Sequence, residues 1–429
     1  MTEEINKTHR MGRGETADVV VVGAGAAGLM ASIWAGRAHP HRTIILLDGA
    51  RTLGAKILVA GGGRCNVTHD EVDAHAYAGS SRPAIQKVLD RFDVSRTVQF
   101  FRELGVELKC EGTGKLFPTT DSARTVLNAL LTAAECADVV IRHPCRVEHV
   151  QRTADGFCVS GDWGQIDART VVLATGGKSL PKSGSDGYGH ELARTLGHQI
   201  TQRVFPALVP LTLSRDHVIC AISGITVPAT LDLWSRRGKL LRSFTDSTLC
   251  AHFGLSGPSV LDMSRYYIDA QLDDPGSILT INWLPGTPPE ALDRAFQHLG
   301  RSTPLQYLRT LLPERLARAI CEHSGVAPGT PGSELQRLPR KALAASATRL
   351  PLPITGNRGY TYAEVTAGGI PLADVRLDTM ASRVCPGLHL CGEICDVDGR
   401  IGGYNFQWAW ASGYVAGVTI GVVAAPSKD

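Results

Sequence analysis

The sequence lacks any apolar run of the roughly 18 residues that a membrane span requires. It also lacks an apolar segment within its first sixteen residues, so no signal peptide is expected. Charge of one sign is not in excess, because 44 lysine and arginine residues nearly balance 41 acidic ones and leave a net charge of +3. Such a balance gives no global signal for nucleic acid, although a local basic patch is not excluded. We therefore expect a cytoplasmic protein with no membrane partner.

The eleven cysteines do not form a disulfide pattern, because their number is odd and they are scattered through a long chain. Cys391 and Cys395 are the closest pair, yet no second Cys or His pair stands beside them at zinc-ligand spacing. A structural zinc ion takes four nitrogen or sulfur ligands. The sequence therefore predicts no metal site.

The chain has 429 residues, which is too long for one ordinary core and suggests two or three domains. The order of strand-like and helix-like segments predicts an α/β fold, in which a Rossmann-like dinucleotide-binding domain in two segments is interrupted by an inserted domain. The predicted parts are a flexible tail (1–16), a first binding segment (17–198), a β-rich, barrel-like insertion (199–288), a helical insertion (289–355) and a second binding segment (356–429).

Four stretches carry more local expectations. Residues 50–76 are glycine-rich and polar, and we predict a functional loop there, since long linkers are uncommon inside compact domains. Residues 82–136 are expected to be mostly helical, and residues 204–285 contain many short β-prone runs. The apolar stretch 414–425 is too short to span a membrane and is expected to be a buried helix.

A glycine turn between two predicted strands carries the first chemical signal. Residues 18–22 form a valine-rich run typical of a strand buried on both faces, and a second strand is expected at 43–47. Between them, residues 23–28 match G-x-G-x-x-G, whose glycines permit a tight turn, the approach of a pyrophosphate and close helix packing. An acid at the end of the second strand can accept a ribose hydroxyl. The predicted dinucleotide contacts are Gly23, Gly25, Ala26, Ala27, Gly28 and Asp48.

Later segments favour FAD over NAD. Residues 174–177, Ala-Thr-Gly-Gly, follow a predicted strand, as is common where a flavoprotein chain returns past its dinucleotide. Glu393 follows another strand and is placed to meet the ribityl chain or a nearby hydroxyl. Residues 402–405 open a helix whose N-terminal N–H groups can face a flavin carbonyl. Because no second G-x-G-x-x-G occurs, a pyridine nucleotide is expected to bind without a Rossmann domain of its own.

Several short motifs run through nearly the whole chain. The most specific are Gly-Gly-Gly-Arg-Cys-Asn at 61–66 and Gly-Gly-Tyr-Asn at 402–405. Others are Gly-Ala-Lys-Ile at 54–57, Phe-Pro at 117–118, Ala-Thr-Gly-Gly-Lys-Ser-Leu-Pro at 174–181, Gly-Leu-Ser-Gly-Pro at 254–258, Thr-Ala-Gly-Gly-Ile at 366–370 and Gly-Glu-Ile-Cys-Asp at 392–396. In these motifs the sequence resembles the BaiN-like (YhiN-like) flavoproteins. Leu180 departs from that pattern, which often has an aromatic residue between serine and proline.

The resemblance implies an FAD domain in two segments and an insertion that covers the flavin. It leaves the substrate open, because the activities of relatives include enone reduction, reduction of a uracil in ribosomal RNA, and amine oxidation. Arg64 is a candidate to neutralise phosphate or reduced flavin, Asn66 to bond the flavin edge, and Lys56 to hold a phosphate or substrate group. The alternatives are loop architecture and a solvated lysine. The further predicted cofactor contacts are Lys56, Gly63, Arg64, Cys65, Asn66, Val147, Ala174, Thr175, Gly176, Gly177, Gly392, Glu393, Gly403, Tyr404 and Asn405.

Two residues are candidates for the proton donor. Cys65 could protonate a reduced carbon if its thiol is reachable and suitably tuned, although buried cysteines are more often inert. His252 precedes the Gly-Leu-Ser-Gly-Pro loop, which the resemblance places facing the flavin. A histidine can exchange a proton near neutral pH, but a lone histidine is more often structural.

The stretch 301–349 is a candidate nucleic-acid surface. It carries eight basic residues against Glu314, Glu322 and Glu334, a local charge of +5 that could meet RNA phosphates. The alternative is a solvated helical face. The basic residues are Arg301, Arg309, Arg315, Arg318, Arg337, Arg340, Lys341 and Arg349.

The leading hypothesis is an FAD enzyme that takes electrons from NAD(P)H and passes hydride from flavin N5 to a polarised C=C bond of an enone-like or uracil-like small molecule. A second makes ribosomal RNA the substrate and the enzyme a dihydrouridine synthase. A third is an amine oxidase that passes electrons to oxygen, and a fourth is a non-catalytic flavin-binding protein. The sequence does not determine the oligomeric state.

Overall fold

The computed structural model describes residues 14–420 and divides the chain into two compact units. Unit 1 comprises residues 1–205 and 365–429, and unit 2 is the continuous stretch 206–364. Each unit has its own hydrophobic core. The predicted α/β fold is confirmed: a Rossmann-like domain in two segments is interrupted by an inserted domain. Residues 1–13 of the predicted tail, and residues 421–425 of the apolar stretch 414–425, lie outside the described residues.

The chain leaves unit 1 within β11 (Phe205–Ala207) and returns to it at the start of β19 (Val365–Ala367). The sequence expectation had placed these crossings at 198/199 and 355/356. Residues 199–205 stay with unit 1 because the Thr201 hydroxyl accepts the N–H of Gly369. Residues 356 and 357 belong to unit 2 because they form a strand, β18 (Gly356–Asn357), that pairs with the sheet of that unit.

Unit 1 is built on a nine-stranded sheet whose central strands β22, β10, β1, β2 and β7 run parallel. Residues 19–22 are all buried, which explains the unbroken valine run. β1 begins at Thr16, so the tail expected to end there is shorter. The strands are β20 (Val375–Arg376), β21 (Ala381–Ser382), β22 (Leu388–Leu390), β10 (Gly164–Leu173), β1 (Thr16–Val22), β2 (Ile44–Leu47), β7 (Val139–Arg142), β8 (His149–Arg152) and β9 (Phe157–Gly161).

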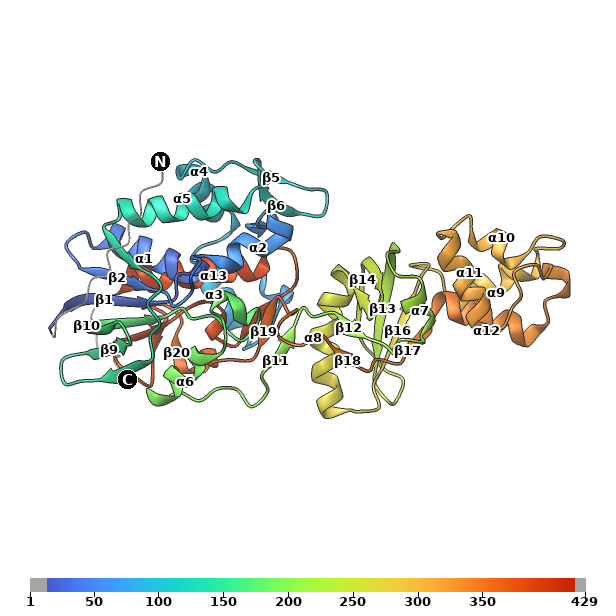
Figure 1. Ribbon diagram of the computed structural model, residues 1–429. Helices are drawn as coiled ribbons and strands as arrows, with labels where there is room; N and C mark the ends of the chain where they lie inside the picture. Colours follow the sequence, from blue (N-terminus) through green and yellow to red (C-terminus); the bar gives the residue numbers. More distant parts are fainter. Residues whose placement is uncertain (1–13, 421–429) are drawn as a thin grey trace. The chain divides into compact units, whose positions relative to one another are not determined.

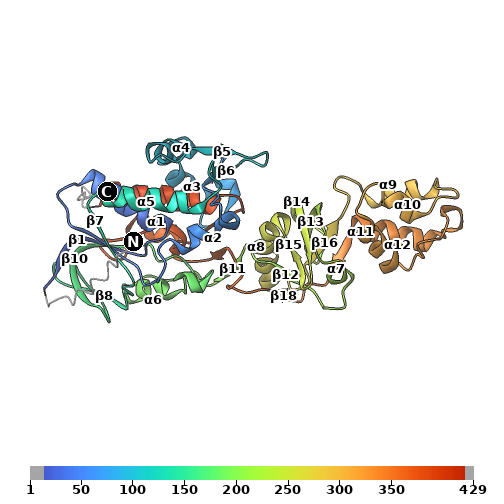
Figure 2. The ribbon, with the colours of Figure 1, turned by 45° about the horizontal axis from the view of Figure 1, so that its top comes forward.

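Three helices, α1 (Ala26–Ala38), α5 (Ala123–Cys136) and α13 (Tyr404–Thr419), lie on one face of this sheet (Figures 1 and 2). The helix α6 (Tyr188–Thr195) lies on the other face, and the hairpin of β8 and β9 branches from the sheet through the pairing of β9 with β10. α1 and α13 approach closely because small residues face each other. A Cβ atom at Gly413 would lie 2.5 Å from the Ala27 carbonyl oxygen, and one at Gly417 would lie 2.5 Å from that of Ala31.

One expectation for the first segment of unit 1 was wrong in detail. Residues 50–76 are not one loop, because α2 (Ala55–Gly63) begins there, although its helical conformation breaks at residues 60–62. Residues 82–136 are mostly helical, as expected, with the hairpin of β5 (Leu108–Cys110) and β6 (Lys115–Pro118) between the helices. The other elements of unit 1 are β3 (Thr68–His69), η1 (Ala74–Ala76), β4 (Tyr77–Gly79), α3 (Arg82–Leu89), α4 (Val94–Glu103), η2 (Pro181–Ser183), η4 (Leu372–Asp374), η5 (Gly392–Ile394) and β23 (Val397–Gly399).

Unit 2 joins a seven-stranded antiparallel sheet to a group of helices. The strand order β17-β16-β13-β14-β15-β12-β18 is an open path, so the expected barrel does not close in the described residues. A 16-residue helix, α8 (Pro258–Asp273), interrupts the stretch expected to be β-rich. The other elements are β12 (Leu211–Thr212), α7 (Val218–Ala221), β13 (Thr226–Trp234), β14 (Leu240–Ala251), β15 (Gly254–Ser256), β16 (Ile278–Asn282), α9 (Pro289–Gln297), α10 (Pro304–Leu308), α11 (Glu314–His323), η3 (Gly332–Glu334), α12 (Arg337–Thr348) and β17 (Leu350–Leu352).

Within residues 14–420, none of the helices is both long and apolar enough to cross a membrane.

The contact between α1 and α13 gives a stability prediction. Gly413→Val should lower the free energy of unfolding by about 1–3 kcal/mol, because the added atoms must displace the α1 backbone in an overpacked core. The urea midpoint of unfolding measures this. Gly112→Val is the control, since a Cβ atom there would meet no atom within 4 Å and the site is exposed. A Gly413→Val midpoint equal to that of the control would contradict the close contact.

Candidate functional site

The predicted glycine turn lies where the parallel strands of unit 1 end. A Cβ atom at Gly28 would lie 1.8 Å from the Gly23 carbonyl oxygen, and one at Gly23 would lie 2.5 Å from that of Ala174. Both positions therefore require glycine. By contrast, a Cβ atom at Gly25 would meet nothing within 4 Å, so there is open space beside that backbone. This is the arrangement expected of a turn that admits a phosphate.

Asp48 is tied to the same turn. Its Oδ2 accepts the N–H of Ala24 at 2.6 Å and its Oδ1 accepts the N–H of Ala50 at 2.7 Å. Burial raises the pKa of this carboxyl, although the two N–H groups act against that shift. The carbonyl of Asp48 accepts the N–H of Cys145, which brings the buried Val147 segment to the end of β2. Asp48 thus shapes the glycine turn, and its oxygens keep further lone pairs for a ligand.

The helices α1 and α13 of unit 1 both begin after a glycine and have no side-chain cap at their N-termini. α1 begins after Gly25, and α13 begins after Gly403, which has a φ of +99°. Neither first turn contains an acidic residue. A Cβ atom at Gly403 would lie 2.5 Å from the Thr68 backbone carbon, so this start of α13 lies directly beside the residues that follow the second glycine loop. Uncapped helix N-termini offer N–H donors and a positive dipole end to anionic or carbonyl groups.

A polar network joins four distant segments of unit 1. Lys56 Nζ lies 2.6 Å from Glu393 Oε2, and both side chains are mostly buried. Glu393 Oε1 accepts the N–H of Thr366 at 2.9 Å, and the Thr366 hydroxyl accepts the N–H groups of Lys178 and Ser179. Both carboxylate oxygens of Glu393 are thus engaged by the protein. Lys56 and Glu393 therefore form an ion pair that links their two segments, whether or not they also contact the cofactor.

The same network explains the positions of two predicted glycines. A Cβ atom at Gly177 would lie 2.4 Å from the Thr366 hydroxyl oxygen, and one at Gly392 would lie 2.7 Å from Ala27 Cβ. Gly176 has a φ of +72° and carries the chain past Ser185. Residues 174–177 and 392–393 therefore meet beside the start of α1.

The second glycine loop is held in a left-handed conformation. Gly61, Gly62 and Gly63 have φ values of +57°, +69° and +88°, and Cys65 follows with +61°. The Cys65 side chain is fully buried, and this burial raises the pKa of its thiol to about 12. The thiol therefore stays protonated at neutral pH and has no solvent contact. These properties weigh against Cys65 as a proton donor that must be reloaded from water.

Arg64 points away from this loop into a set of acids. Its guanidinium lies 2.6 Å from Glu111, 3.5 Å from Asp121 and 3.9 Å from the centre of the Phe117 ring. These partners fasten the loop to the hairpin of β5 and β6. The arrangement supports the architectural alternative for Arg64.

Three predicted cofactor contacts, Asn405, Tyr404 and Asn66, differ in whether their side chains already contact other residues of the protein. The Asn405 side chain bonds the backbone of Gly399 and Arg400, so it closes its own turn. Tyr404 stacks on His69 with ring centres 4.9 Å apart. Asn66, in contrast, is 8% exposed, and its Oδ1 has no hydrogen-bond partner among residues 14–420.

His252 belongs to unit 2, where its side chain is exposed beside Phe253. The structure therefore brings together the predicted residues of unit 1 and describes His252 separately.

Sequence reasoning missed two residues of this site. Thr366 is the hub of the polar network, and His190 of α6 is 3% exposed with its Nε2 lacking a hydrogen-bond partner in the described part of the chain. Burial and the nearby charges of Lys178 and Arg194 lower the pKa of His190. Thr366 lies in the Thr-Ala-Gly-Gly-Ile motif, which is the signal that could have identified it.

The residues present fit FAD. A buried polar atom without a partner costs about 1–3 kcal/mol, so such atoms favour a ligand contact. Asn66 Oδ1 and Thr175 Oγ1 are two such atoms, and they stand in the two glycine-rich segments. The residues that would hold FAD are those of the 23–28 turn, Asp48, Asn66, Thr175 and the N-terminus of α13.

The Lys56–Glu393 pair gives a second stability prediction. Glu393→Gln keeps an acceptor for Thr366 but removes the charge opposite Lys56, and should cost about 1–3 kcal/mol of unfolding free energy. Denaturation is followed both with FAD in excess and after its removal, so that weaker cofactor binding is separated from lost packing. Glu191→Gln is the control, because its pair with Arg194 is exposed and should change stability by less than about 0.5 kcal/mol. Equal effects of the two variants would contradict a structural role for the pair.

Comparison with known proteins agrees with this architecture. Residues 17–419 match the model of the family described as HI0933-like protein Rossmann domain. The chain is 34% identical to the 3-dehydro-bile acid delta(4,6)-reductase of Clostridium scindens, over 92% of this chain and 97% of that protein. It is 32% identical to the ribosomal RNA dihydrouridine synthase of Escherichia coli, over 93% of this chain and 97% of that protein.

Solved structures share the fold at low sequence identity. The 3-ketosteroid delta1-dehydrogenase of Sterolibacterium denitrificans superposes with a TM-score of 0.52 at 12% identity, covering 95% of this chain and 99% of that one. The quinol fumarate reductase FrdA of E. coli gives 0.51 at 16% identity, covering 97% and 72%. The family match over nearly the whole chain confirms the resemblance inferred from the motifs. The protein belongs to the HI0933-like family of Rossmann-fold, FAD-dependent oxidoreductases.

Proposed function

We propose that the protein uses NAD(P)H to reduce a C=C bond conjugated to a carbonyl group in a small planar substrate. The observation that carries this proposal is the cradle of unit 1, in which the glycine turn, two uncapped helix N-termini and two unpartnered buried polar atoms fit FAD. Two relatives of nearly full length support the reaction class. The names of both, a delta(4,6)-reductase and a dihydrouridine synthase, describe the addition of two hydrogens to a ring double bond.

The residues of the chain have separate tasks in this reaction. Bound FAD would accept a hydride from NAD(P)H and supply one to the substrate. The N–H groups at the start of α13 would stabilise negative charge on the cofactor. The substrate also needs one proton for each hydride it receives. His252 is the proposed donor, because its ring is exposed, whereas the Cys65 thiol is fully buried.

The test separates the two half-reactions. Mixed with NADPH or NADH without oxygen, the FAD-loaded protein should lose its flavin absorbance, and a conjugated acceptor should restore it. His252→Ala should leave the first step unchanged and slow the second by about 10²-fold, the size of a typical acid–base contribution. Cys65→Ala is the comparison and should slow neither step.

Two results would contradict this scheme. Full turnover by His252→Ala would remove the proton-donor assignment. Absence of bleaching with both nicotinamides would remove NAD(P)H as reductant, and peroxide formation from an amine and oxygen would then identify an oxidase. If none of the reductants tested reduces the bound flavin, the protein is a non-catalytic flavin-binding protein.

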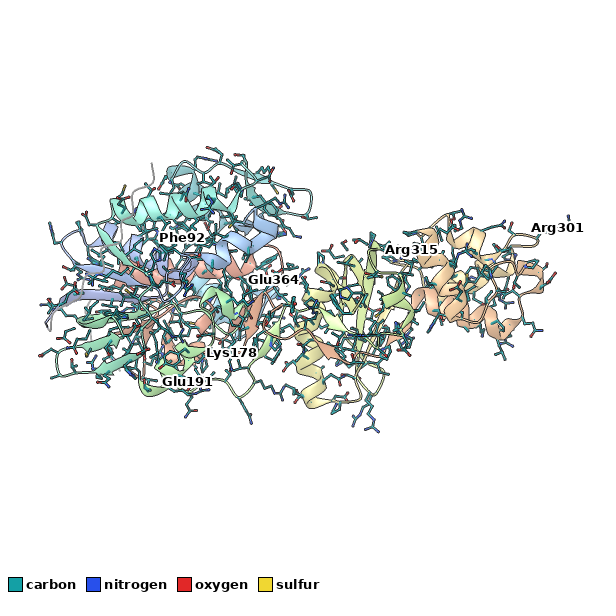
Figure 3. The ribbon with its side chains drawn as sticks, viewed as in Figure 1. Phe92, Lys178, Glu191, Arg301, Arg315 and Glu364 are labelled. Carbon is teal, nitrogen blue, oxygen red and sulfur yellow. The ribbon has the colours of Figure 1, made fainter. Side chains whose placement is uncertain are left out.

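Ribosomal RNA is a second candidate substrate, favoured by exposed basic residues of unit 2. Arg337 and Lys341 of α12 are exposed and form no salt bridge within the described residues, and Leu338 between them is 80% exposed. Arg301 and Arg315 are likewise exposed and unpaired in residues 14–420 (Figure 3). These four basic residues could meet phosphates.

The other basic residues of 301–349 already have partners within unit 2. Arg340 pairs with Asp293 at 2.8 Å with both side chains mostly buried, and Arg309 and Arg318 share Glu314. Arg349 stacks on Trp234. The basic surface is therefore smaller than the sequence suggests, and Arg340 belongs to the packing of α9 and α12.

Charge reversal tests the RNA hypothesis. The double variant Arg337→Glu, Lys341→Glu should weaken binding of ribosomal RNA and reduce its salt dependence by a slope of about two, one unit for each lost phosphate contact. Fluorescence anisotropy at several salt concentrations measures both. Arg82→Glu with Arg169→Glu is the control, since it changes the net charge equally at exposed positions of unit 1. Equal weakening by both pairs, or no salt-dependent binding at all, would exclude this surface.

A further inference from the structure

Exposed apolar side chains gather at one end of the sheet of unit 2. Trp234, at the end of β13, pairs with Leu240 of β14 on one side and with Ile278 of β16 on the other, so the three side chains form a row across the sheet. Leu240 is 45% exposed and Ile278 is 49% exposed. Leu241 is the extra residue of a bulge in β14 and is also exposed.

A fourth apolar side chain, Leu272, lies near the end of α8 and belongs to the same end of the sheet. Asp274, in the turn after α8, accepts the backbone N–H of Arg236 at 2.9 Å. A Cβ atom at Gly276 would lie 2.8 Å from Arg236 Cδ. The turn from α8 to β16 is therefore packed against the turn from β13 to β14. We call Leu240, Leu241, Leu272 and Ile278 the apolar patch.

This grouping sets the apolar patch apart from the rest of the chain. Ten large apolar side chains are exposed in residues 14–420, and four of them belong to the apolar patch. Single exposed apolar residues are ordinary on protein surfaces, whereas a group of them indicates an interaction site. The other six lie on other elements: Val59, Val140, Leu311, Leu338, Tyr362 and Val384.

Cations surround the apolar patch. The turn between β13 and β14 carries Arg236, Arg237 and Lys239, and Arg242 follows the bulge. All four are exposed, and they form no salt bridge within the part of the chain that the structure describes. The Arg242 guanidinium stacks on Tyr266 at 4.7 Å from the ring centre, so its charge is not neutralised by this contact.

Two acids, Asp273 and Asp274, stand in the neighbouring turn after α8. Asp274 already accepts the N–H groups of Arg236 and Gly276, which hold that turn. The four cations outnumber these acids, and the surface therefore favours an anionic partner.

The apolar side chains decide between two anionic partners. An RNA would use the cations, but RNA is bound by aromatic stacking and polar contacts and gains little from exposed leucines. The aromatic ring of the row, Trp234, is half-buried and already stacks on the Arg349 guanidinium at 4.4 Å. A lipid surface uses both groups, because the headgroups attract cations while aliphatic side chains enter the boundary of the acyl chains.

We propose that the β13–β14 turn and the apolar patch dock unit 2 onto an anionic membrane surface. The four apolar side chains would enter the interface, and the cations around them would lie against the headgroups. The expectation of no membrane partner rests on the absence of a spanning segment and of a signal peptide, and binding at the surface needs neither. Docking also requires neither the cofactor nor the proposed reaction.

Vesicle flotation of the full, FAD-loaded chain measures the docking. The vesicles contain either equal parts of phosphatidylcholine and phosphatidylglycerol or phosphatidylcholine alone. Leu240→Thr with Ile278→Thr removes apolar side chains but keeps residues that suit a strand, and Arg237→Gln with Lys239→Gln removes two cations. Each pair should lower the partition coefficient onto the anionic vesicles by about tenfold or more, since one cation near the surface contributes about fivefold.

Each pair has a matched control in unit 2. Leu311→Thr with Leu338→Thr changes two exposed leucines outside the apolar patch. Arg301→Gln with Arg315→Gln removes two exposed and unpaired cations, and so changes the net charge equally. The urea midpoints of all four double variants show whether any of them loses binding because it loses its fold.

Binding to anionic vesicles that both test pairs weaken and both controls leave unchanged supports the docking surface. Absence of vesicle binding by the unchanged protein, or equal binding by either test pair, would overturn it. The same holds if the unchanged protein binds an RNA oligonucleotide instead of vesicles and Arg237→Gln with Lys239→Gln weakens that binding, because the surface would then be a nucleic-acid site.

Discussion

The close contact between α1 and α13 is the constraint on which unit 1 depends. The two helices come from opposite ends of the chain, and glycines on α13 let its backbone approach the α1 backbone directly. A buried glutamine extends this join, because Gln407 of α13 bonds Thr68, Thr97 and the Phe92 carbonyl. The returning segment is thereby fixed against the first one, so that Gly392 meets Ala27 of the glycine turn and Gly403 lies beside Thr68.

The cofactor cradle follows from this join. The first segment alone contains the G-x-G-x-x-G turn and Asp48, which are enough for a phosphate and a ribose. The partner of Lys56 and the second uncapped helix N-terminus come only with the returning segment. A domain divided by an insertion of 159 residues, 206–364, therefore assembles its site only when both segments have folded together.

The polar residues of the site fall into two physical groups. In the first group, the side chains bond other residues of the protein, and these bonds hold the loops of the site in one conformation. This group contains Arg64, Glu393 and Asn405. Asn66, Thr175 and His190 each keep a buried polar atom that has no partner among the described residues. Since unpaired buried atoms are costly, the second group is where a ligand gains most from binding.

The sequence by itself determined the Rossmann-like turn, its acid, the two-segment order and the family, because these depend on local patterns of glycine, β-branched residues and short motifs. It could not decide which motif residues bind each other. Lys56 and Glu393 are 337 positions apart, and Arg64 pairs with Glu111 on a hairpin inside a stretch that was expected to be mostly helical. Only the tertiary structure decides such pairs, because they depend on how distant strands and loops are brought together. The hydrophobic periodicity of the sequence reports local structure alone.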